Sequence, residues 1–413
     1  MPVGSTMGLR RAGQTAVVPE SDDAAATGPV PIGGHVAPGY EPVRDAFAAN
    51  FAERGEVGAA VCVRVRGEVV VDLWGGWADE ARTRPWCEDT LVNVYSVGKA
   101  VAAALVLRLV DEGRLALDQP VADVWPEFAV GGKAGATVAH ALSHQAGVPA
   151  IREPLTNDDL WDWDAMTAAL AATDAWYEPG SRLIYHTNTY GHLVGGLVHR
   201  VTGERPGGHL RALVDGWGLD RPVDYWIGVP DADLHRCADV VWAPSGLGMS
   251  ADLDPDSLEG DARLLWLAYF NPPGYSSVGV VNTREWRQTQ VPSTNAHASA
   301  RGVCDLYAAI LGDLGGEPLV SPALLADATR PWVSGPCPVL GEVGTFGLGF
   351  IPTNPRRSFF PNPHSFGHFG TGGAVGCADP GAGIAFGYVM NHVVPRWQSS
   401  RNRALLDTLA ACL

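Results

Sequence analysis

Segments with a strand pattern lie towards both ends of the chain, and helix patterns fill the region between them. Residues 57–65 and 68–74 are two valine-rich runs joined by Arg66-Gly67, which is a suitable hairpin turn. The last third alternates glycine-rich turns with short strand patterns, at 347–352, 367–378 and 384–390. Strands from both ends, with helices between them, predict one mainly antiparallel sheet that both ends of the chain build together.

This pattern predicts an α+β fold, in which an antiparallel sheet is flanked by helices and carries an inserted, mostly helical lobe. We expect residues 38–113 and 281–413 to form the sheet domain and residues 114–280 to form the helical lobe. Residues 1–37 are rich in Gly, Ala, Pro, Ser and Asp and lack the apolar run of a signal peptide, so a flexible N-terminal arm is expected. Helix patterns cover residues 100–110, 190–201, 298–311 and 399–411.

Composition argues against several classes of partner. The chain carries 29 basic and 45 acidic residues, a formal net charge of −16, and its arginines are scattered. Nucleic acid and anionic membrane surfaces are therefore not expected as partners. No apolar stretch has the length needed to span a membrane. The seven cysteines form no Cys-x-x-Cys pair, which favours reduced thiols in a cytoplasmic protein.

One of the two lysines in the chain, Lys99, stands three residues after Ser96 at the start of an alanine- and leucine-rich helix pattern. The i, i+3 spacing places the Lys99 amine on the same helical face as the Ser96 hydroxyl, within reach of its proton. A helix N-terminus also favours the negative charge that develops when a serine attacks a carbonyl. The alternative interpretation is that Ser96 only caps the helix and that Lys99 is a solvated cation.

Ser-x-x-Lys is a signature of serine β-lactamases and penicillin-binding proteins, which need two further elements beside the serine. The first is a residue that handles the proton, and Tyr185 follows a Pro-Gly turn and precedes a helix pattern. The second is a strand against which a substrate can lie. The glycine-dense segment 366–373 has the composition for such a strand.

At this point the chain resembles the β-lactamase-related serine hydrolases: class C β-lactamases, family VIII carboxylesterases, D-amino acid peptidases and related acyltransferases. The resemblance spans about residues 40–410 and implies the same fold. It is carried by Ser96-Val97-Gly98-Lys99, residues 109–121, residues 141–147, Pro179-Gly180 with Tyr185, residues 346–350, and residues 367–370 and 387–391.

Two positions depart from the family pattern. The Tyr-x-Asn element reads Tyr185-His186-Thr187, so threonine replaces the asparagine that contacts an amide of lactam substrates. The Lys-Thr-Gly element reads His368-Phe369-Gly370, which removes a fixed cation, because histidine is mostly neutral near pH 7. Both departures disfavour β-lactams and resemble the esterase and acyltransferase branches.

The resemblance implies a role for each residue of the site. Ser96 would attack an acyl carbonyl, with Lys99 and Tyr185 sharing its proton. The backbone N–H groups of Ser96 and Thr371 would hold the oxyanion. The substrate-binding residues would be His368, Gly370, Thr371 and Thr187.

The first interpretation is a serine acyl-enzyme esterase acting on a small-molecule carboxylic ester. The alternative is an acyltransferase, either a transesterase or an amide-forming transacylase, that passes the acyl group to an alcohol or amine. A β-lactamase or D-amino acid peptidase ranks below these, and a non-catalytic binding module ranks last. No cofactor is expected. No metal is expected either, because the pairs His364/His368 and His186/His192 lack matching carboxylates. Aromatic residues of the helical lobe that lie on loops facing Ser96 could wall the substrate pocket, and the candidates are Trp161, Trp163, Trp176, Tyr225, Trp226, Trp242, Trp266, Tyr269, Phe270 and Tyr275.

Overall fold

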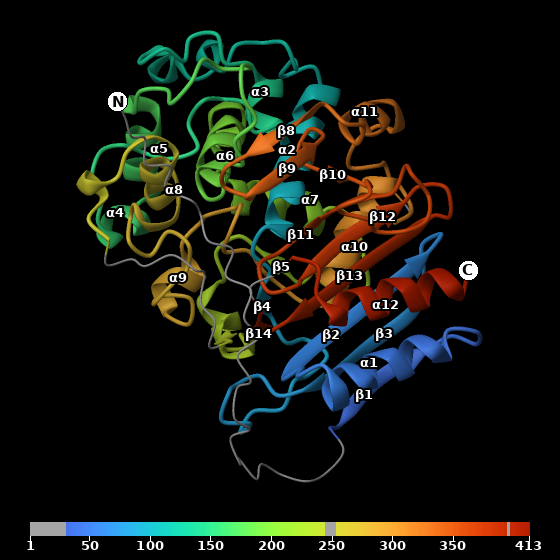
Figure 1. Ribbon diagram of the computed structural model, residues 1–413. Coiled ribbons are helices and arrows are strands. Elements are labelled where there is room, and N and C mark those ends of the chain that lie inside the picture. The colour runs from blue at the N-terminus through green and yellow to red at the C-terminus, as the bar shows by residue number, and fades with distance from the viewer. Residues whose placement is uncertain (1–29, 244–252, 315, 395–396) are drawn as a thin grey trace, which may run out of the picture.

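Seven strands form one antiparallel sheet in the order β1-β3-β2-β13-β12-β11-β10, and both ends of the chain contribute to it (Figure 1). The structure, a computed structural model, describes residues 30–243, 253–314, 316–394 and 397–413. The strand β2 (Gly58–Val65) pairs on one side with β3 (Glu68–Gly76) and on the other with β13 (Ile384–Met390). The predicted antiparallel sheet, and with it the α+β fold, is therefore confirmed.

The predicted hairpin turn is present between β2 and β3. Arg66 and Gly67 both have positive φ angles, of 51° and 84°, which suit the twist of a two-residue hairpin. The predicted run at 367–378 is two strands, β11 (Phe366–Phe369) and β12 (Val375–Asp379), because the glycines between them form a turn. The run at 347–352 was predicted too long, since only β10 (Ile351–Pro352) pairs with the sheet.

The flexible arm expected for residues 1–37 is contradicted at residues 32–36, which form a strand. Residues 1–29 lie outside the described part of the chain, but β1 (Ile32–Val36) is an edge strand paired with β3 from Ile32↔Gly75 to Val36↔Val71. The glycines that indicated flexibility lie instead against β3. A Cβ on Gly34 would stand 1.9 Å from the carbonyl oxygen of Asp72, so this strand packs closely because it lacks side chains there.

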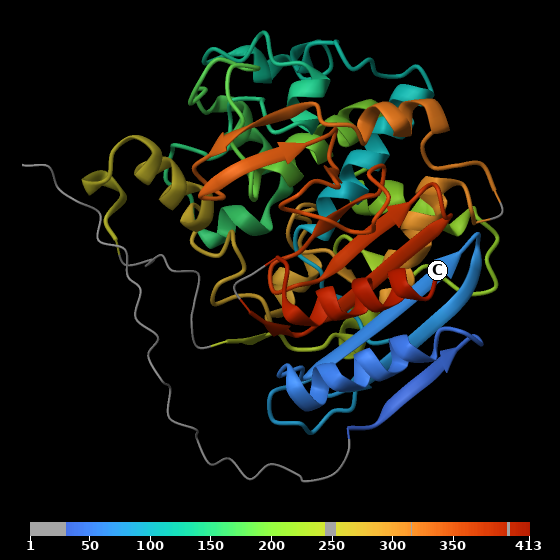
Figure 2. The same ribbon diagram turned by 45° about the vertical axis from the view of Figure 1, so that its right-hand side comes forward.

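Helices cover both faces of the sheet. The helices α1 (Glu41–Glu53) and α12 (Ser400–Ala411) lie side by side on one face, as the turned view shows (Figure 2). On the opposite face, α10 (Ala300–Leu311) packs on β13, β2 and β12, and α2 (Val97–Asp111) packs on β11. Almost every residue of α2 is buried, which fits its run of alanine, valine and leucine.

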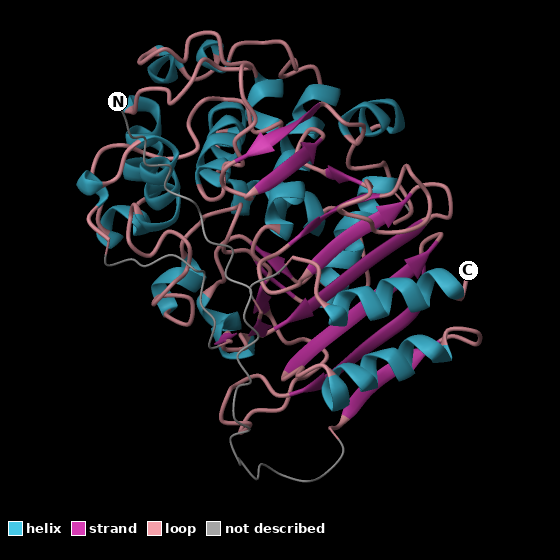
Figure 3. Ribbon diagram, viewed as in Figure 1, coloured by secondary structure: helices cyan, strands magenta, loops and turns pink. Residues whose placement is uncertain are grey.

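The remaining helices gather beside the sheet and cover the far side of α2 (Figure 3). They are α3 (Val138–Leu142), α4 (Asn157–Trp161), α5 (Trp163–Ala172), α6 (Thr189–Thr202), α7 (Pro206–Asp215), α8 (Gly260–Phe270), α9 (Arg284–Gln288) and α11 (Pro322–Ala328), with the 3-10 helices η1 (Val121–Asp123), η2 (Pro126–Ala129), η3 (Asp231–Arg236) and η4 (Pro255–Ser257). The short strands form three small sheets: β4 (Val92–Asn93), β7 (His297–Ala298) and β5 (Tyr225–Trp226); β14 (His392–Val393) and β6 (Val241–Trp242); β8 (Val333–Cys337) and β9 (Glu342–Phe346).

The division into a sheet domain of residues 38–113 and 281–413 and a helical lobe of residues 114–280 stays a prediction. Among the described residues, no helix combines the length and the apolarity that crossing a bilayer requires.

Candidate active site

Ser96 stands at the start of α2 without capping it. Its side chain makes no hydrogen bond to the backbone of the first helical turn, so the hydroxyl is not used as an N-cap. The residue before it, Tyr95, has a φ of +51°, which is a strained conformation for a non-glycine residue. This strained turn presents the Ser96 hydroxyl at a pocket rather than folding it back onto the helix.

Lys99 is fully buried beside Ser96, and its amine has three oxygen neighbours. Nζ lies 2.9 Å from the Ser96 Oγ, 2.6 Å from the Thr187 carbonyl oxygen and 3.0 Å from the Ser293 carbonyl oxygen. Burial lowers the pKa of Lys99 well below its ordinary 10.5, and no carboxylate opposes this shift. A neutral amine has two N–H donors and one lone pair. In this neutral form the two carbonyls would take the donors, which would leave the lone pair for the Ser96 hydroxyl.

Gly98 explains how the Ser293 carbonyl comes within 3.0 Å of the Lys99 amine. A Cβ at this position would lie 2.2 Å from the Pro292 carbonyl oxygen, so a side chain would push the 292–293 segment away from α2. The glycine between Ser96 and Lys99 therefore helps to place an acceptor for the lysine.

Tyr185 lies over the amine, in the loop before α6. The Lys99 Nζ is 4.9 Å from the centre of the Tyr185 ring, and the tyrosine is almost wholly buried. Burial raises the pKa of Tyr185 well above 10, and the nearby Ser96 hydroxyl opposes this rise only in part. Its hydroxyl has no hydrogen-bond partner in the part of the chain that the structure describes. The structure thus brings Ser96, Lys99 and Tyr185 together. Among the described residues, the Tyr185 hydroxyl has no acceptor for its proton.

Ser96 and Thr371 line the same pocket, as an oxyanion site requires. Neither backbone N–H has an acceptor among the described residues, whereas the neighbouring Gly370 N–H donates to the Ala374 carbonyl. Gly370 itself does not line the pocket. A Cβ there would stand 2.3 Å from the Val94 carbonyl oxygen, so glycine allows the end of β11 to approach the turn that carries Ser96.

His368, which we expected to bind the substrate, is not on the wall of the pocket in front of Ser96. The residue is fully buried and does not line the pocket, because its ring lies behind those of Tyr185 and Trp397, with centroids 6.3 and 6.0 Å away. Its Nδ1 is bonded to the Phe369 carbonyl, and burial lowers the pKa of His368 to about 3, so the ring is neutral. Thr187 does line the pocket, and its carbonyl also holds Lys99.

The pocket in front of Ser96 has a volume of about 510 Å³ and is walled by aromatic and aliphatic side chains. Tyr269 is the member of the expected aromatic set that lines it. Trp397 and the aliphatic Val339 and Leu340 lie on the same walls. Trp397 meets Tyr185 edge to face at 5.3 Å between ring centres.

One ion pair faces this pocket. The Arg357 guanidinium donates to the Glu342 carboxylate, and its central carbon lies 5.4 Å from the centre of the Trp397 ring. Both side chains are about a quarter exposed. Among the described residues that line the pocket, Arg357 is the one with a fixed positive charge, and its partner Glu342 also pairs with Arg356 at 3.6 Å.

The beta-lactamase family model matches residues 43–410. The chain belongs to the beta-lactamase family. It is similar to the Esterase/beta-lactamase LipL of Mycobacterium tuberculosis, with 32% identity over 379 residues that cover 86% of this chain and 82% of that protein. A solved family VIII carboxylesterase is 38% identical, with a TM-score of 0.82, and the match covers 93% of this chain and 100% of that chain.

A penicillin-binding protein homologue from Caulobacter crescentus shows the same identity, coverage and TM-score as that carboxylesterase. The resemblance to β-lactamase-like serine hydrolases is therefore confirmed, and so is the expected enzyme class.

The contributors to this beta-lactamase-family site that sequence reasoning missed include Ser293, Glu342, Arg357 and Trp397. Each comes from a loop or strand end outside the motif blocks, and three of them act through side chains that no local pattern marks. The Ser293 contribution is a backbone carbonyl, which any residue type could supply. No sequence signal distinguished these residues from ordinary surface and core positions.

Proposed function

We propose that this chain is a serine esterase that acts on uncharged carboxylic esters through a Ser96 acyl-enzyme. The observation that carries the proposal is the Lys99 amine, whose two N–H donors face carbonyl oxygens while its remaining side lies 2.9 Å from the Ser96 hydroxyl. A buried, neutral amine in this position is a general base for a serine nucleophile. The esterase and carboxylesterase relatives support the same chemistry.

The steps follow from the positions of the groups. Lys99 takes the proton as Ser96 Oγ attacks the ester carbonyl, and the N–H groups of Ser96 and Thr371 receive the oxyanion. Tyr185, which burial keeps protonated, then donates a proton to the departing alkoxide. The Lys99 ammonium then returns its proton to Tyr185. Water attacks the acyl-enzyme, and the same relay passes one proton from the water to Ser96 Oγ as the acid leaves.

Activity is expected to fall at low pH, because protonation of Lys99 removes its lone pair. The pKa of this acid limb should equal that of Lys99, which lies well below 10.5. His144, His186 and His368 face this region, but burial lowers the pKa of each, so they add no charge near neutrality. The measurement is kcat/KM for 4-nitrophenyl butyrate between pH 5 and 10. An acid limb at the pKa of an ordinary lysine would contradict the proposed base.

Ester turnover is expected to exceed β-lactam turnover by at least about a hundredfold in kcat/KM. The physical reason is that nitrocefin carries a carboxylate, and the Arg357 guanidinium that could hold it is already engaged in an ion pair with Glu342. The measurement follows nitrocefin and 4-nitrophenyl butyrate with one enzyme preparation. Equal efficiency on the two substrates would show that the pocket accepts β-lactams and would remove the preference for esters.

Glu342→Gln is expected to shift selectivity towards an anionic ester. Without the carboxylate, the Arg357 guanidinium becomes free to meet a negative charge, which for a partly exposed pair gives about a fivefold gain. The matched substrates are 4-nitrophenyl pentanoate and mono-4-nitrophenyl glutarate. The variant should gain on the glutarate and stay within about twofold of the wild type on the pentanoate. Adding Arg357→Gln should abolish the gain, and a gain that survives it would exclude Arg357 as the cause.

Acyl transfer is the alternative for the same acyl-enzyme. An alcohol or amine that packs on Tyr269 and Trp397 could attack in place of water, because binding beside the ester raises its effective concentration. Ester assays repeated with added alcohols and amines separate the two outcomes. If the acylated acceptor forms in excess of the free acid, acyl transfer rather than hydrolysis is the main activity. The cytoplasmic location stays a prediction.

A further inference from the structure

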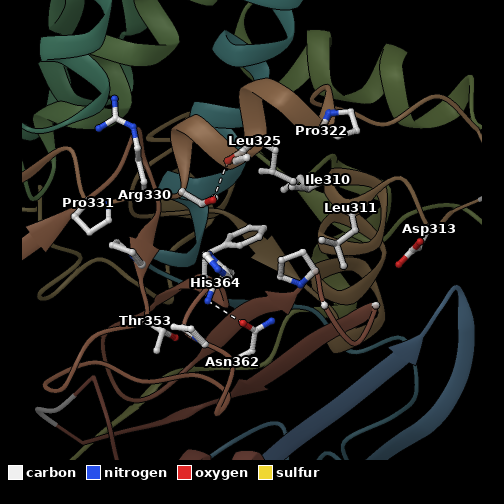
Figure 4. A pocket seen from close by; sticks show the side chains of 18 of the residues that line it. Ile310, Leu311, Asp313, Pro322, Leu325, Arg330, Pro331, Thr353, Asn362 and His364 are labelled. Carbon is white, nitrogen blue, oxygen red and sulfur yellow. Dashed lines mark hydrogen bonds between the residues drawn. The ribbon is translucent and has the colours of Figure 1, made fainter.

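A second cavity, of about 840 Å³, lies away from the catalytic pocket and shares no lining residue with it. It opens between α11, the end of α10 and the start of β11, near the turn that joins β12 to β13 (Figure 4). The strand β11 runs from Phe366 at this cavity to Phe369, just before the turn that carries Thr371. The volume is in the range that accommodates a small organic ligand.

The walls of this cavity are apolar and rigid. Ile310 and Leu311 of α10, Leu325 of α11 and Phe366 of β11 supply the hydrophobic surface. The rim includes five prolines, whose fixed φ angles limit how far the walls can collapse: Pro322, Pro331, Pro352, Pro363 and Pro380.

The polar side chains at the cavity already have partners within the protein. The Thr329 hydroxyl donates to the Leu325 carbonyl at 2.8 Å, and the hydroxyls of Thr353 and Ser365 bond to each other at 2.6 Å. Asn362 accepts from the His364 backbone N–H and donates to Asp379. These groups therefore have few free hydrogen-bond donors or acceptors for a polar ligand.

The charges at the cavity are balanced and lie at its rim. Arg330 is paired with Asp327 at 2.6 Å, whereas Arg66 and Asp313 attract each other without lying within ion-pair distance. Figure 4 shows Arg330 and Asp313 at opposite sides of the opening, with the hydrophobic side chains between them. A charged ligand would have to leave water for walls that are mostly apolar, whereas an uncharged one would lose no such hydration.

We propose that this cavity is a binding site for an uncharged, apolar small molecule. Recognition rests on the shape of the proline-rimmed walls and on burial of apolar surface. The proposal does not depend on the catalytic chemistry, since the two pockets have separate walls.

The test uses two fluorescent probes that differ by one charge. N-phenyl-1-naphthylamine is uncharged, and its 8-sulfonate has the same rings with a negative charge. The uncharged probe is expected to bind the wild-type chain with one site and at least about tenfold more tightly than the sulfonate. Equal or tighter binding of the sulfonate would overturn the assignment of an uncharged ligand.

Tryptophan substitutions locate the bound probe. Ala326→Trp fills the cavity from an exposed position on α11, and Ala323→Trp on the same helix is the matched control outside it. Val339→Trp fills the catalytic pocket instead. Only Ala326→Trp should weaken binding of the uncharged probe, by at least about tenfold. Unchanged binding in this variant, or loss of binding in Val339→Trp, would overturn the proposal.

His364→Trp blocks the cavity from its opposite, exposed wall and serves as the second variant if Ala326→Trp does not fold. Circular dichroism and the melting temperature establish folding before each titration. A folded His364→Trp chain that binds the uncharged probe as the wild type does would equally refute the site.

Discussion

Ser96→Ala is expected to reduce ester turnover by at least about a thousandfold while the chain stays folded. Loss of the nucleophile removes the acyl-enzyme route altogether, and only binding and the oxyanion site remain to assist attack by water. The fold should survive because the Ser96 side chain caps no helix, and among the described residues its hydroxyl is hydrogen-bonded only to the Lys99 amine. The measurement is kcat for 4-nitrophenyl butyrate, with the melting temperature as the check on folding.

Ser143→Ala is the matched control for this experiment. Ser143 is also buried and precedes a histidine, but its hydroxyl donates to the Ala139 carbonyl at 2.7 Å at the end of α3, so its role is structural. This variant should keep its turnover per folded molecule. Full activity in a folded Ser96→Ala chain, or its loss in Ser143→Ala alone, would reassign the nucleophile.

Lys99→Met and Tyr185→Phe should each lower kcat/KM by at least about a hundredfold, and the double variant should be little worse than the poorer single one. The two side chains handle one proton between Ser96 and the leaving group, so removing either one interrupts the same transfer. The measurement is a double-mutant cycle on kcat/KM for one ester. If the double variant loses kcat/KM by the product of the two single-variant factors, the two residues act in separate steps.

Lys133→Met is the control for Lys99, because the chain has only these two lysines. Lys133 is also buried, and its amine donates to the Val130 and Thr173 carbonyls at 2.7 and 2.5 Å, but no serine hydroxyl lies among its partners. Its replacement should affect the melting temperature and leave turnover per folded molecule within about threefold. A hundredfold loss in this variant would show that burying a lysine matters here for reasons other than base catalysis.

The central part of the site was predictable because it depends on local geometry. Ser96 and Lys99 lie one helical turn apart, so the periodicity of the helix fixes their approach whatever the rest of the chain does. The sheet was predictable for a similar reason. The valine-rich runs and the Arg66-Gly67 turn specify a hairpin locally, and the run at 384–390 matches β13 in full.

The parts of the site that could not be predicted depend on the paths of the loops. Arg357 and Trp397 reach the pocket from segments whose path is set by packing against distant elements. His368 lies off the pocket wall for a different reason: the motif places it on β11, but its ring packs beside Tyr185 and its Nδ1 is hydrogen-bonded to the adjacent carbonyl. The glycines in residues 32–36 led to a wrong prediction of flexibility there, because close packing and flexibility favour the same composition.

The pairing of Val65 with Ile384 has a consequence for biosynthesis. Once the ribosome has made β2 and β3, the free edge of β2 must wait for β13, which at ordinary translation rates takes roughly 20–60 s. During that interval an apolar strand edge stands open to other nascent chains. The centre of the sheet therefore closes late in synthesis, and chaperone supply during expression should govern the yield of this protein more strongly than its equilibrium stability does.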